Sequence, residues 1–396
     1  MMQISPEIQL FIREHSSDDV RVLALQAKKY PDIDMPTVIT QIAGRKVAAE
    51  KIPSWWEIEK IWYPKHLSLE QCSSEITARY KARLLQGDSL TDLTGGFGID
   101  CSFLATGFKS ATYVERQEEL CEIAAHNFPV LNLNHINIKN EDGVTYLQAM
   151  SPVDCLFLDP ARRNEHGGKT VAISDCEPNV AELEELLLQK ANRVMIKLSP
   201  MLDLSLALKE LKQTQEVHIL SVNNECKELL ILLGQTSPAE ISIHCVNLFT
   251  KGTQKEQHFV FTHEQEQCSE CTYTDSLETY LYEPNASLLK AGAFRSIAAA
   301  YPVRKLHPNS HLYTSDTFIE NFPGRIFRIV NQCSFNKKEV KENLADLKKA
   351  NVTVRNFPAT VAELRKRIHL AEGGDTYLFA STLNNGQKVL IRCEKV

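Results

Sequence analysis

The segment that most constrains the fold is 90–100, which reads LTDLTGGFGID. A short apolar run ends at Asp92, a turn with Gly95, Gly96 and Gly98 follows, and the apolar face of a helix comes next. Glycines let the backbone approach a ligand that any side chain would block, and a helix start offers free N–H groups. This order of strand, glycine turn and helix is typical of the nucleotide site of a doubly wound α/β domain. This pattern alone does not distinguish proteins that bind NAD, FAD or S-adenosylmethionine (SAM). It also leaves open a glycine turn that binds no ligand.

The composition is that of an ordinary globular chain. It has 396 residues, 43% of them hydrophobic and 24% charged, which is enough for two or three domains. No basic segment followed by an apolar region opens the chain, and no apolar run approaches the length of a membrane span. Eleven scattered cysteines, an odd number, favour reduced thiols over a disulfide framework. We therefore expect a cytoplasmic protein with no membrane partner.

The cysteines do not indicate a metal site. The close pair Cys268 and Cys271 lacks the second pair that a zinc ribbon requires. The sequence therefore predicts no metal.

Charge is distributed unevenly along the chain. The net charge is −6, but residues 321–396 hold fourteen Lys and Arg against seven Asp and Glu, which gives +7 there and leaves −13 for the first 320 residues. A basic terminal module on an acidic body is consistent with an anionic partner. The alternative is a solvated helix face.

The pattern of apolar residues predicts a helical N-terminal domain (1–70), an α/β domain (71–275), a small helical segment (276–320) and a small α+β domain (321–396). In the N-terminal domain Trp55, Trp56 and Trp62 are expected to anchor the helices on the body. A strand pattern alternates with helices from 90 to 198, which indicates a parallel sheet with helices on both faces. The runs 216–222 and 229–234 leave no room for a helix between them, so we expect an antiparallel hairpin, with a further hairpin over 241–262.

The last two segments have weaker patterns. Residues 280–285 are expected to open a helix over 286–301. The segment 321–396 reads β-α-β-α-β-β, with a helix over 338–350 and a strand over 352–355.

Acidic residues follow three further strands of the predicted sheet. Glu115 ends the second strand, 23 residues after Asp92, where a carboxylate accepts both hydroxyls of a ribose. Asp142 ends the third strand, within reach of an adenine amine, and Asp159 ends the fourth. Because the ends of parallel strands meet at one edge of a sheet, these residues are expected near the glycine turn.

In this combination the chain resembles the class I SAM-dependent methyltransferases over about residues 70–262. Asp92, Thr94, Gly96 and Gly98 match the family motif that holds the methionine part of SAM, Glu115 matches its ribose-binding acid and Asp142 its adenine-side acid. The terminal hairpin is similar to that family's reversed last strand. The resemblance implies SAM as cofactor and a Rossmann-like fold, with cofactor contacts from Asp92, Thr94, Gly95, Gly96, Gly98, Glu115, Arg116 and Asp142.

The sequence Asp159-Pro160-Ala161-Arg162 is similar to the fourth-strand motif of nucleic-acid methyltransferases. Methyl transfer is an in-line displacement, so catalysis needs positioning and a group that accepts a proton. The Asp159 carboxylate and the backbone fixed by Pro160 are expected to hold the acceptor. Ala161 and Arg162 replace the second proline and the aromatic of the amine-methylating form, which leaves the acceptor atom open.

Basic residues near this motif are candidates for substrate binding. Arg162 and Arg163 are expected either to hold a phosphate or to form a surface salt bridge. Lys197, in a buried strand, is expected to neutralise an anionic substrate or Asp159, or else to extend to the strand end.

The whole chain resembles a bacterial family of methyltransferases with a small ferredoxin-like insert and a C-terminal THUMP-like domain. The segments 283–292 (EPNASLLKAG) and 354–358 (VRNFP) carry this resemblance. Because THUMP domains bind RNA, it implies a structured RNA, such as tRNA or rRNA, as substrate.

The leading hypothesis is therefore a SAM-dependent methyltransferase acting on RNA. Three alternatives remain open. They are a non-catalytic RNA-binding protein with a relic methyltransferase fold, a methyltransferase with a protein or small-molecule acceptor, and an NAD-linked oxidoreductase, which predicts a parallel strand in place of the hairpin.

Overall fold

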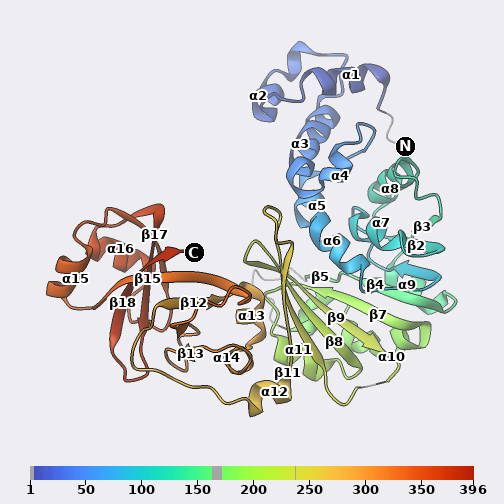
Figure 1. Ribbon diagram of the computed structural model, residues 1–396. Helices are drawn as coiled ribbons and strands as arrows, with labels where there is room; N and C mark the ends of the chain where they lie inside the picture. The colour runs from blue at the N-terminus through green and yellow to red at the C-terminus, as the bar shows by residue number, and fades with distance from the viewer. Residues whose placement is uncertain (1–3, 163–171, 237) are drawn as a thin grey trace. The chain divides into compact units, whose positions relative to one another are not determined.

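The computed structural model describes residues 4–162, 172–236 and 238–396. The chain divides into two compact units (Figure 1). The first holds 1–215 and 230–238, and the second holds 216–229 and 239–396. All eleven cysteines are free thiols. No helix in the described part of the chain has both the length and the apolar character that crossing a membrane requires.

The first unit begins with short helices, as the pattern over 1–70 predicts. Ser5 caps the first helix by accepting a hydrogen bond from the Ile8 N–H, and Asp34 caps the longest one by accepting from the Thr37 N–H. The helices are α1 (Pro6–Glu14), α2 (Val20–Leu25), η1 (Ala27–Lys29), α3 (Met35–Lys51), α4 (Pro53–Trp56) and α5 (His66–Gln71). Helix α6 (Glu75–Ala82) then leads into the first strand.

Two tryptophans attach these helices to the α/β body, as predicted. Trp55 is 2% exposed and meets the Phe97 ring edge-on, with the ring centroids 5.2 Å apart. Trp62 stacks on His126 at 3.8 Å. The prediction is wrong for Trp56, which is 41% exposed. Because Phe97 belongs to the glycine turn, the packing of the N-terminal helices reaches the predicted ligand site directly.

A large sheet forms the body, in the order β11-β10-β8-β9-β7-β4-β1-β2-β3. Its strands β3, β2, β1, β4 and β7 run parallel. The strands are β1 (Ser89–Asp92), β2 (Ser110–Glu115), β3 (Ile136–Asn140), β4 (Val153–Leu158), β7 (Ala191–Leu198), β8 (Thr214–Val222), β9 (Glu225–Gly234), β10 (Ser242–Leu248) and β11 (Glu256–Thr262). A separate pair is made by β5 (Ala161–Arg162) and β6 (Cys176–Glu177).

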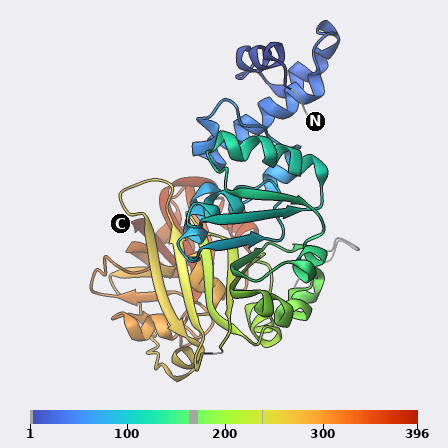
Figure 2. The same cartoon turned by 90° about the vertical axis from the view of Figure 1, so that its right-hand side faces the viewer.

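The parallel strands are joined by helices, which fixes the layers. The strand order reverses after β3, so right-handed crossovers put α7 (Ile99–Ala105) and α8 (Glu118–Val130) on one face and α9 (Gly143–Ala149) and α10 (Val180–Lys190) on the other (Figures 1 and 2). Helix α11 (Leu204–Glu210) follows β7, and η2 (Ile173–Asp175) precedes β6. The Rossmann-like α/β body that the sequence predicts is thus confirmed.

The predicted hairpin is also present. Only Asn223 and Asn224 separate β8 from β9, and both have positive φ, 49° and 68°. This is the conformation of a type I′ turn, which joins antiparallel strands. Strand β9 lies between β7 and β8. The parallel continuation that an NAD-linked oxidoreductase predicts is therefore wrong at this place.

Strands β10 and β11 extend the sheet as the second predicted hairpin. Strand β10 pairs parallel with β8 and antiparallel with β11. Helix α12 (His263–Cys268) follows β11 and is capped by Thr262.

The C-terminal part of the second unit forms one sheet in the order β13-β14-β12-β15-β18-β17-β16. Its strands are β12 (Tyr280–Pro284), β13 (Arg304–Lys305), β14 (Tyr313–Ser315), β15 (Gly324–Ser334), β16 (Lys349–Val354), β17 (Ala371–Thr382) and β18 (Lys388–Lys395). Its helices are α13 (Ala286–Ala291), α14 (Ser296–Ala300), α15 (Lys337–Leu344) and α16 (Val361–Ile368). This sheet includes strands from both 276–320 and 321–396.

Three sequence predictions are wrong in this part. Residues 280–284 form a strand because they pair on both sides, with β14 and β15. The predicted helix over 286–301 is two helices, since Gly292 has φ +77° and ends α13. The predicted helix over 338–350 ends at Leu344, and 349–354 pairs parallel with β17 instead.

The burial of Trp55 gives a test of how the N-terminal helices are held. Trp55→Ala removes a buried ring from the Phe97 contact and is expected to lower the free energy of unfolding by about 3–5 kcal/mol. Trp56→Ala is the matched control, and its surface position predicts a loss below about 1 kcal/mol. Urea titrations of both variants check this. Equal losses would contradict the anchoring role of Trp55.

Candidate functional site

The glycine turn between β1 and α7 is held by its own backbone and by β2. The Gly95 N–H donates to the Val114 carbonyl at 2.8 Å, and the Gly98 N–H donates to the Gly95 carbonyl at 2.9 Å. A Cβ atom on Gly95 would lie 2.2 Å from the Tyr113 ring. Gly96 and Gly98 have φ of +55° and +87°, a conformation that side-chain-bearing residues rarely adopt. The structure therefore explains why each of these three positions in the turn requires a glycine.

Glu115 joins the end of β2 to this turn. Its Oε2 accepts the Gly96 N–H at 2.9 Å, and its Oε1 accepts the Gln117 N–H at 2.8 Å. The side chain is buried. Each carboxylate oxygen accepts more than one hydrogen bond, so both oxygens retain capacity for hydroxyl donors.

Asp142 begins α9 on the neighbouring strand end. Its Oδ1 accepts the N–H groups of Val144 and Thr145, both at 3.0 Å, which makes it the helix cap. Asp142 is exposed. The next residue, Gly143, packs so closely on the first strand end that a Cβ atom there would lie 2.2 Å from the Leu93 carbonyl oxygen. This contact brings the Asp142 loop against the start of the glycine turn.

Asp92 and Thr94 link β1 to the fourth strand end. The Asp92 Oδ1 accepts the Thr94 N–H at 3.0 Å, and the Thr94 Oγ1 accepts the Asp159 N–H at 2.6 Å. Asp92 is fully buried, and its Oδ2 has no hydrogen-bond partner among the described residues. Burial, reinforced by the neighbouring carboxylates, raises the pKa of Asp92 well above its usual value.

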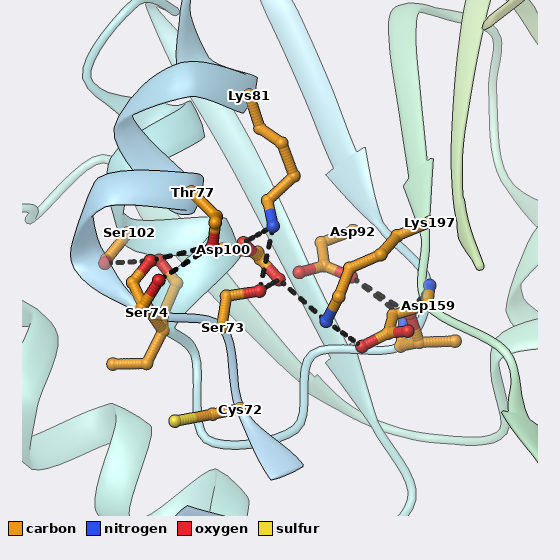
Figure 3. A network of polar contacts seen from close by, with 12 residues as sticks. Cys72, Ser73, Ser74, Thr77, Lys81, Asp92, Asp100, Ser102, Asp159 and Lys197 are labelled. Atoms are coloured by element: carbon orange, nitrogen blue, oxygen red, sulfur yellow. Dashed lines mark hydrogen bonds and ion pairs between the residues drawn. The ribbon is translucent and has the colours of Figure 1, made fainter. Parts of the chain in front are cut away.

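A buried ion network lies beside these residues, and the sequence pattern alone did not predict it. Asp100, in the first turn of α7, pairs with the buried Lys81 of α6 at 3.0 Å and accepts a hydrogen bond from the Ser73 hydroxyl at 2.7 Å (Figure 3). Burial alone would raise the pKa of Asp100, but the Lys81 and Lys197 ammonium groups and the Ser73 hydroxyl outweigh it and lower the pKa. One signal was available, because Lys81 lies at helical spacing between the buried Ala78 and Leu85.

Lys197 connects this network to the fourth strand end. Its Nζ lies 3.5 Å from the Asp100 Oδ2 and donates a hydrogen bond to the Asp159 Oδ2 (Figure 3). Burial raises the pKa of Asp159, and the Lys197 ammonium opposes that shift. The Asp159 side chain is still 38% exposed, so it faces both the network and the outside. Of the roles expected for Lys197, pairing with Asp159 is the one seen in the structure.

The other predicted residues are less closely involved. Pro160 is buried directly after Asp159. Arg116 is exposed and pairs with Glu177 at 3.4 Å. The backbone of Arg162 lies in β5, where it pairs with Cys176. Arg163 lies outside the described residues.

Together these side chains form an acidic edge with two buried lysines. The carboxyl groups come from Asp92, Asp100, Glu115 and Asp159, against Lys81 and Lys197. Since Lys81 and Lys197 pair with Asp100 and Asp159, the excess negative charge of this edge lies mainly on Glu115, whose carboxylate disfavours a pyrophosphate and favours a ligand that carries positive charge.

The raised pKa of Asp92 gives a stability prediction. A carboxyl whose folded pKa lies above its unfolded value of about 3.9 destabilises the fold progressively as the pH rises through that value. Asp92→Asn keeps an oxygen for the Thr94 N–H and carries no charge, so at pH 7.5 it is expected to be at least as stable as the wild type, with a smaller advantage at pH 4.5. Urea titrations at both pH values measure this. A loss above about 1 kcal/mol at pH 7.5 would show that the ionised Asp92 is well satisfied.

Comparison with known proteins places the chain in a family. Residues 280–323 match the model of a ferredoxin-like domain, and 324–395 match that of a THUMP domain-like family. A crystal structure described as a "putative methyltransferase" from Porphyromonas gingivalis W83 is 35% identical, with a TM-score of 0.87, and the match covers 98% of each chain. No curated protein matches.

Two further solved structures match a smaller share of the chain. One is an rRNA methylase from Streptococcus thermophilus (14% identical, 40% of this chain and 93% of that chain, TM-score 0.30). The other is a "putative methyltransferase" from Streptococcus mutans in complex with SAH (14% identical, 40% of this chain and 96% of that chain, TM-score 0.30). At these TM-scores neither carries an argument. At 35% identity over nearly the whole of both chains, this chain belongs to the same family as the Porphyromonas gingivalis protein, with a ferredoxin-like and a THUMP-like region following its α/β body.

Proposed function

We propose that this chain is a SAM-dependent methyltransferase that acts on a structured RNA. The observation that carries the proposal is the position of Glu115, which holds the Gly96 N–H from the end of the adjacent strand. A carboxylate at this place is suited to accept the hydroxyls of a ribose lying along the turn.

The residues of the site fit SAM in three respects. A Cβ atom on Gly96 would lie 3.8 Å from its nearest neighbour among the described residues, so the backbone there is open to a ligand. The buried Asp92 Oδ2 lacks a hydrogen-bond partner in the described part of the chain. The acidic edge favours the positive charge of a sulfonium and disfavours a pyrophosphate. Asp92, Thr94 and the turn glycines would hold the methionine part, Glu115 the ribose and Asp142 the adenine side.

The chemistry on the acceptor side falls to Asp159. SAM supplies, when bound, a methyl group activated by its positive sulfur. Asp159 is exposed enough to meet an acceptor group and is held in place by Lys197 and by the Thr94 contact with its backbone. Its raised pKa suits a group that takes up a proton as the acceptor atom is methylated. The buried Pro160 restricts the conformational freedom of the backbone next to Asp159.

The RNA part of the proposal depends on the THUMP-like region. Basic side chains are exposed on α15, on α16 and around the start of β16, namely Lys337, Lys338, Lys341, Lys348, Lys349, Lys366 and Arg367. Two other basic residues, Arg325 and Arg355, are engaged in ion pairs with the same carboxylate, that of Glu283. The exposed set is suited to phosphate contacts, which position an RNA without reading its sequence.

Calorimetry with SAM tests the cofactor assignment. The wild type is expected to bind one SAM, and Glu115→Gln is expected to weaken binding at least tenfold because it removes the charge that holds the turn and the ribose. Gly96→Arg is expected to abolish binding. Glu118→Gln, on the exposed start of α8, is the matched control and is expected to bind normally. Absence of SAM binding in the wild type, or normal binding by Glu115→Gln, would overturn the cofactor assignment.

Mass spectrometry of RNA nucleosides tests the substrate. A strain lacking the gene is expected to lose one methylated nucleoside, which the wild-type gene restores and Asp159→Asn does not. SAM binding with no change in any RNA nucleoside would overturn the RNA assignment. It would point instead to a protein or small-molecule acceptor, or to a fold that no longer catalyses.

The exposed basic residues give a separate prediction. Replacing Lys337, Lys338 and Lys366 with Ala is expected to weaken RNA binding and to flatten its salt dependence, by about 0.7–0.9 in logarithmic slope for each phosphate that the variant no longer neutralises. The control replaces three exposed lysines of the N-terminal region with Ala, namely Lys28, Lys29 and Lys60. Filter binding at several salt concentrations compares them, and an equal weakening in the two triple variants would contradict a specific role for α15 and α16.

A further inference from the structure

Nitrogen and oxygen donors from two neighbouring strands of the second unit converge on one face. Glu216 and His218 are two residues apart on β8, so their side chains project to the same side of the strand. His244 of β10 lies directly opposite His218 in the parallel register. One ligand atom from each of these three residues lies within 4.8 Å of the other two.

The distances within this cluster are close to those of a metal site. The Glu216 Oε2 and His218 Nε2 atoms are 3.3 Å apart, and the His218 and His244 rings stack with centroids 4.3 Å apart. Tetrahedral Zn²⁺, with bonds of about 2.0–2.2 Å to nitrogen and oxygen, places its ligand atoms roughly 3.4 Å from each other. To share one ion, the His218 and His244 rings, now stacked with an interplanar angle of 17°, have to turn so that one nitrogen of each faces the Glu216 carboxylate.

A third histidine supports the arrangement. His258 of β11 has its Nε2 3.1 Å from the His244 Nδ1, and the two rings are stacked. Hydrogen bonds from a second layer of side chains are the usual means of orienting a metal-binding imidazole. The cluster is shielded from solvent at one end and accessible at the other, because His218 is 3% exposed, whereas Glu216 is partly exposed and His258 is exposed.

We propose that Glu216, His218 and His244 bind a divalent transition-metal ion, with Zn²⁺ the best match, and that His258 orients His244. Two neutral imidazoles and one carboxylate are a donor set that Zn²⁺ accepts, and three protein ligands leave a position open for water or another ligand. The cluster lies near the amino ends of β8 and β10, whereas the residues proposed to bind SAM follow the carboxyl ends of their strands. This site is thus additional to the proposed function, and it departs from the prediction, made from the cysteines, that no metal is bound.

Metal titration of the full chain without a histidine tag tests the proposal. After treatment with EDTA, the wild type is expected to bind one Zn²⁺ per chain in calorimetry at pH 7.5. Glu216→Gln and His244→Ala are each expected to weaken this binding at least tenfold. His263→Ala, which changes an exposed histidine just after β11, is the control and is expected to bind like the wild type.

Two further measurements separate the site from unspecific binding and from misfolding. Co²⁺ in place of Zn²⁺ is expected to give the visible absorption of a tetrahedral ion in the wild type and not in His244→Ala. Zn²⁺ is expected to raise the melting temperature of the wild type, while the metal-free melting temperature of Glu216→Gln stays close to that of the metal-free wild type. Two results would overturn the proposal. If the wild type binds no Zn²⁺, the histidines are only a stack of hydrogen-bonded rings. If His244→Ala binds Zn²⁺ as tightly as the wild type, other groups, such as thiols, hold the ion.

Discussion

The hydrogen bond from the Gly96 N–H to the Glu115 carboxylate is the interaction on which the α/β body's candidate site depends. It ties the turn after β1 to the end of β2, and the second carboxylate oxygen ties the same side chain to the start of α8 through Gln117. A buried carboxylate that accepts two backbone N–H groups is well satisfied. The turn thereby has a fixed shape before any ligand arrives, and a site organised in advance loses less conformational entropy on binding.

A second constraint joins the helix before β1 to the strand ends. Lys81 of α6, Asp100 of α7 and Lys197 of β7 form one chain of ion pairs that ends at Asp159. Burying a charge costs folding free energy unless the charge is paired, so removing one member of the network leaves its neighbours as buried charges without a partner. The network therefore couples the position of Asp159 to the helices on either side of the glycine turn. In the proposed reaction, this fixes the acceptor group relative to the cofactor.

The parts of the fold that are determined by local pattern could be predicted from the sequence. Alternating strands and helices, the glycine turn and the short link at Asn223 and Asn224 all have signals within a few residues. Strand β12 was missed because its state is decided by pairing with β14 and β15, which are distant in sequence. A glycine at position 292 was enough to divide a helix that the apolar spacing continued.

In the candidate site, too, residues with a local sequence signal could be predicted, whereas those placed by contacts between distant segments could not. The positions of Asp92, Glu115 and Asp142 were predictable because each lies at or just after the end of a strand in a parallel sheet. The ion pair of Lys81 and Asp100 was not, because it depends on the contact in space between helices α6 and α7. The cluster of Glu216, His218 and His244 needed the strand register, which places His244 opposite His218.

A crystal structure of the chain with S-adenosylhomocysteine is the decisive measurement for the proposed cofactor site. The ribose hydroxyls are expected to bind the Glu115 carboxylate while the nucleoside lies along Gly96, with the adenine beside Asp142 and the sulfur facing Asp159. A ribose that does not contact Glu115, or a nucleoside bound elsewhere on the molecule, would contradict the proposed site.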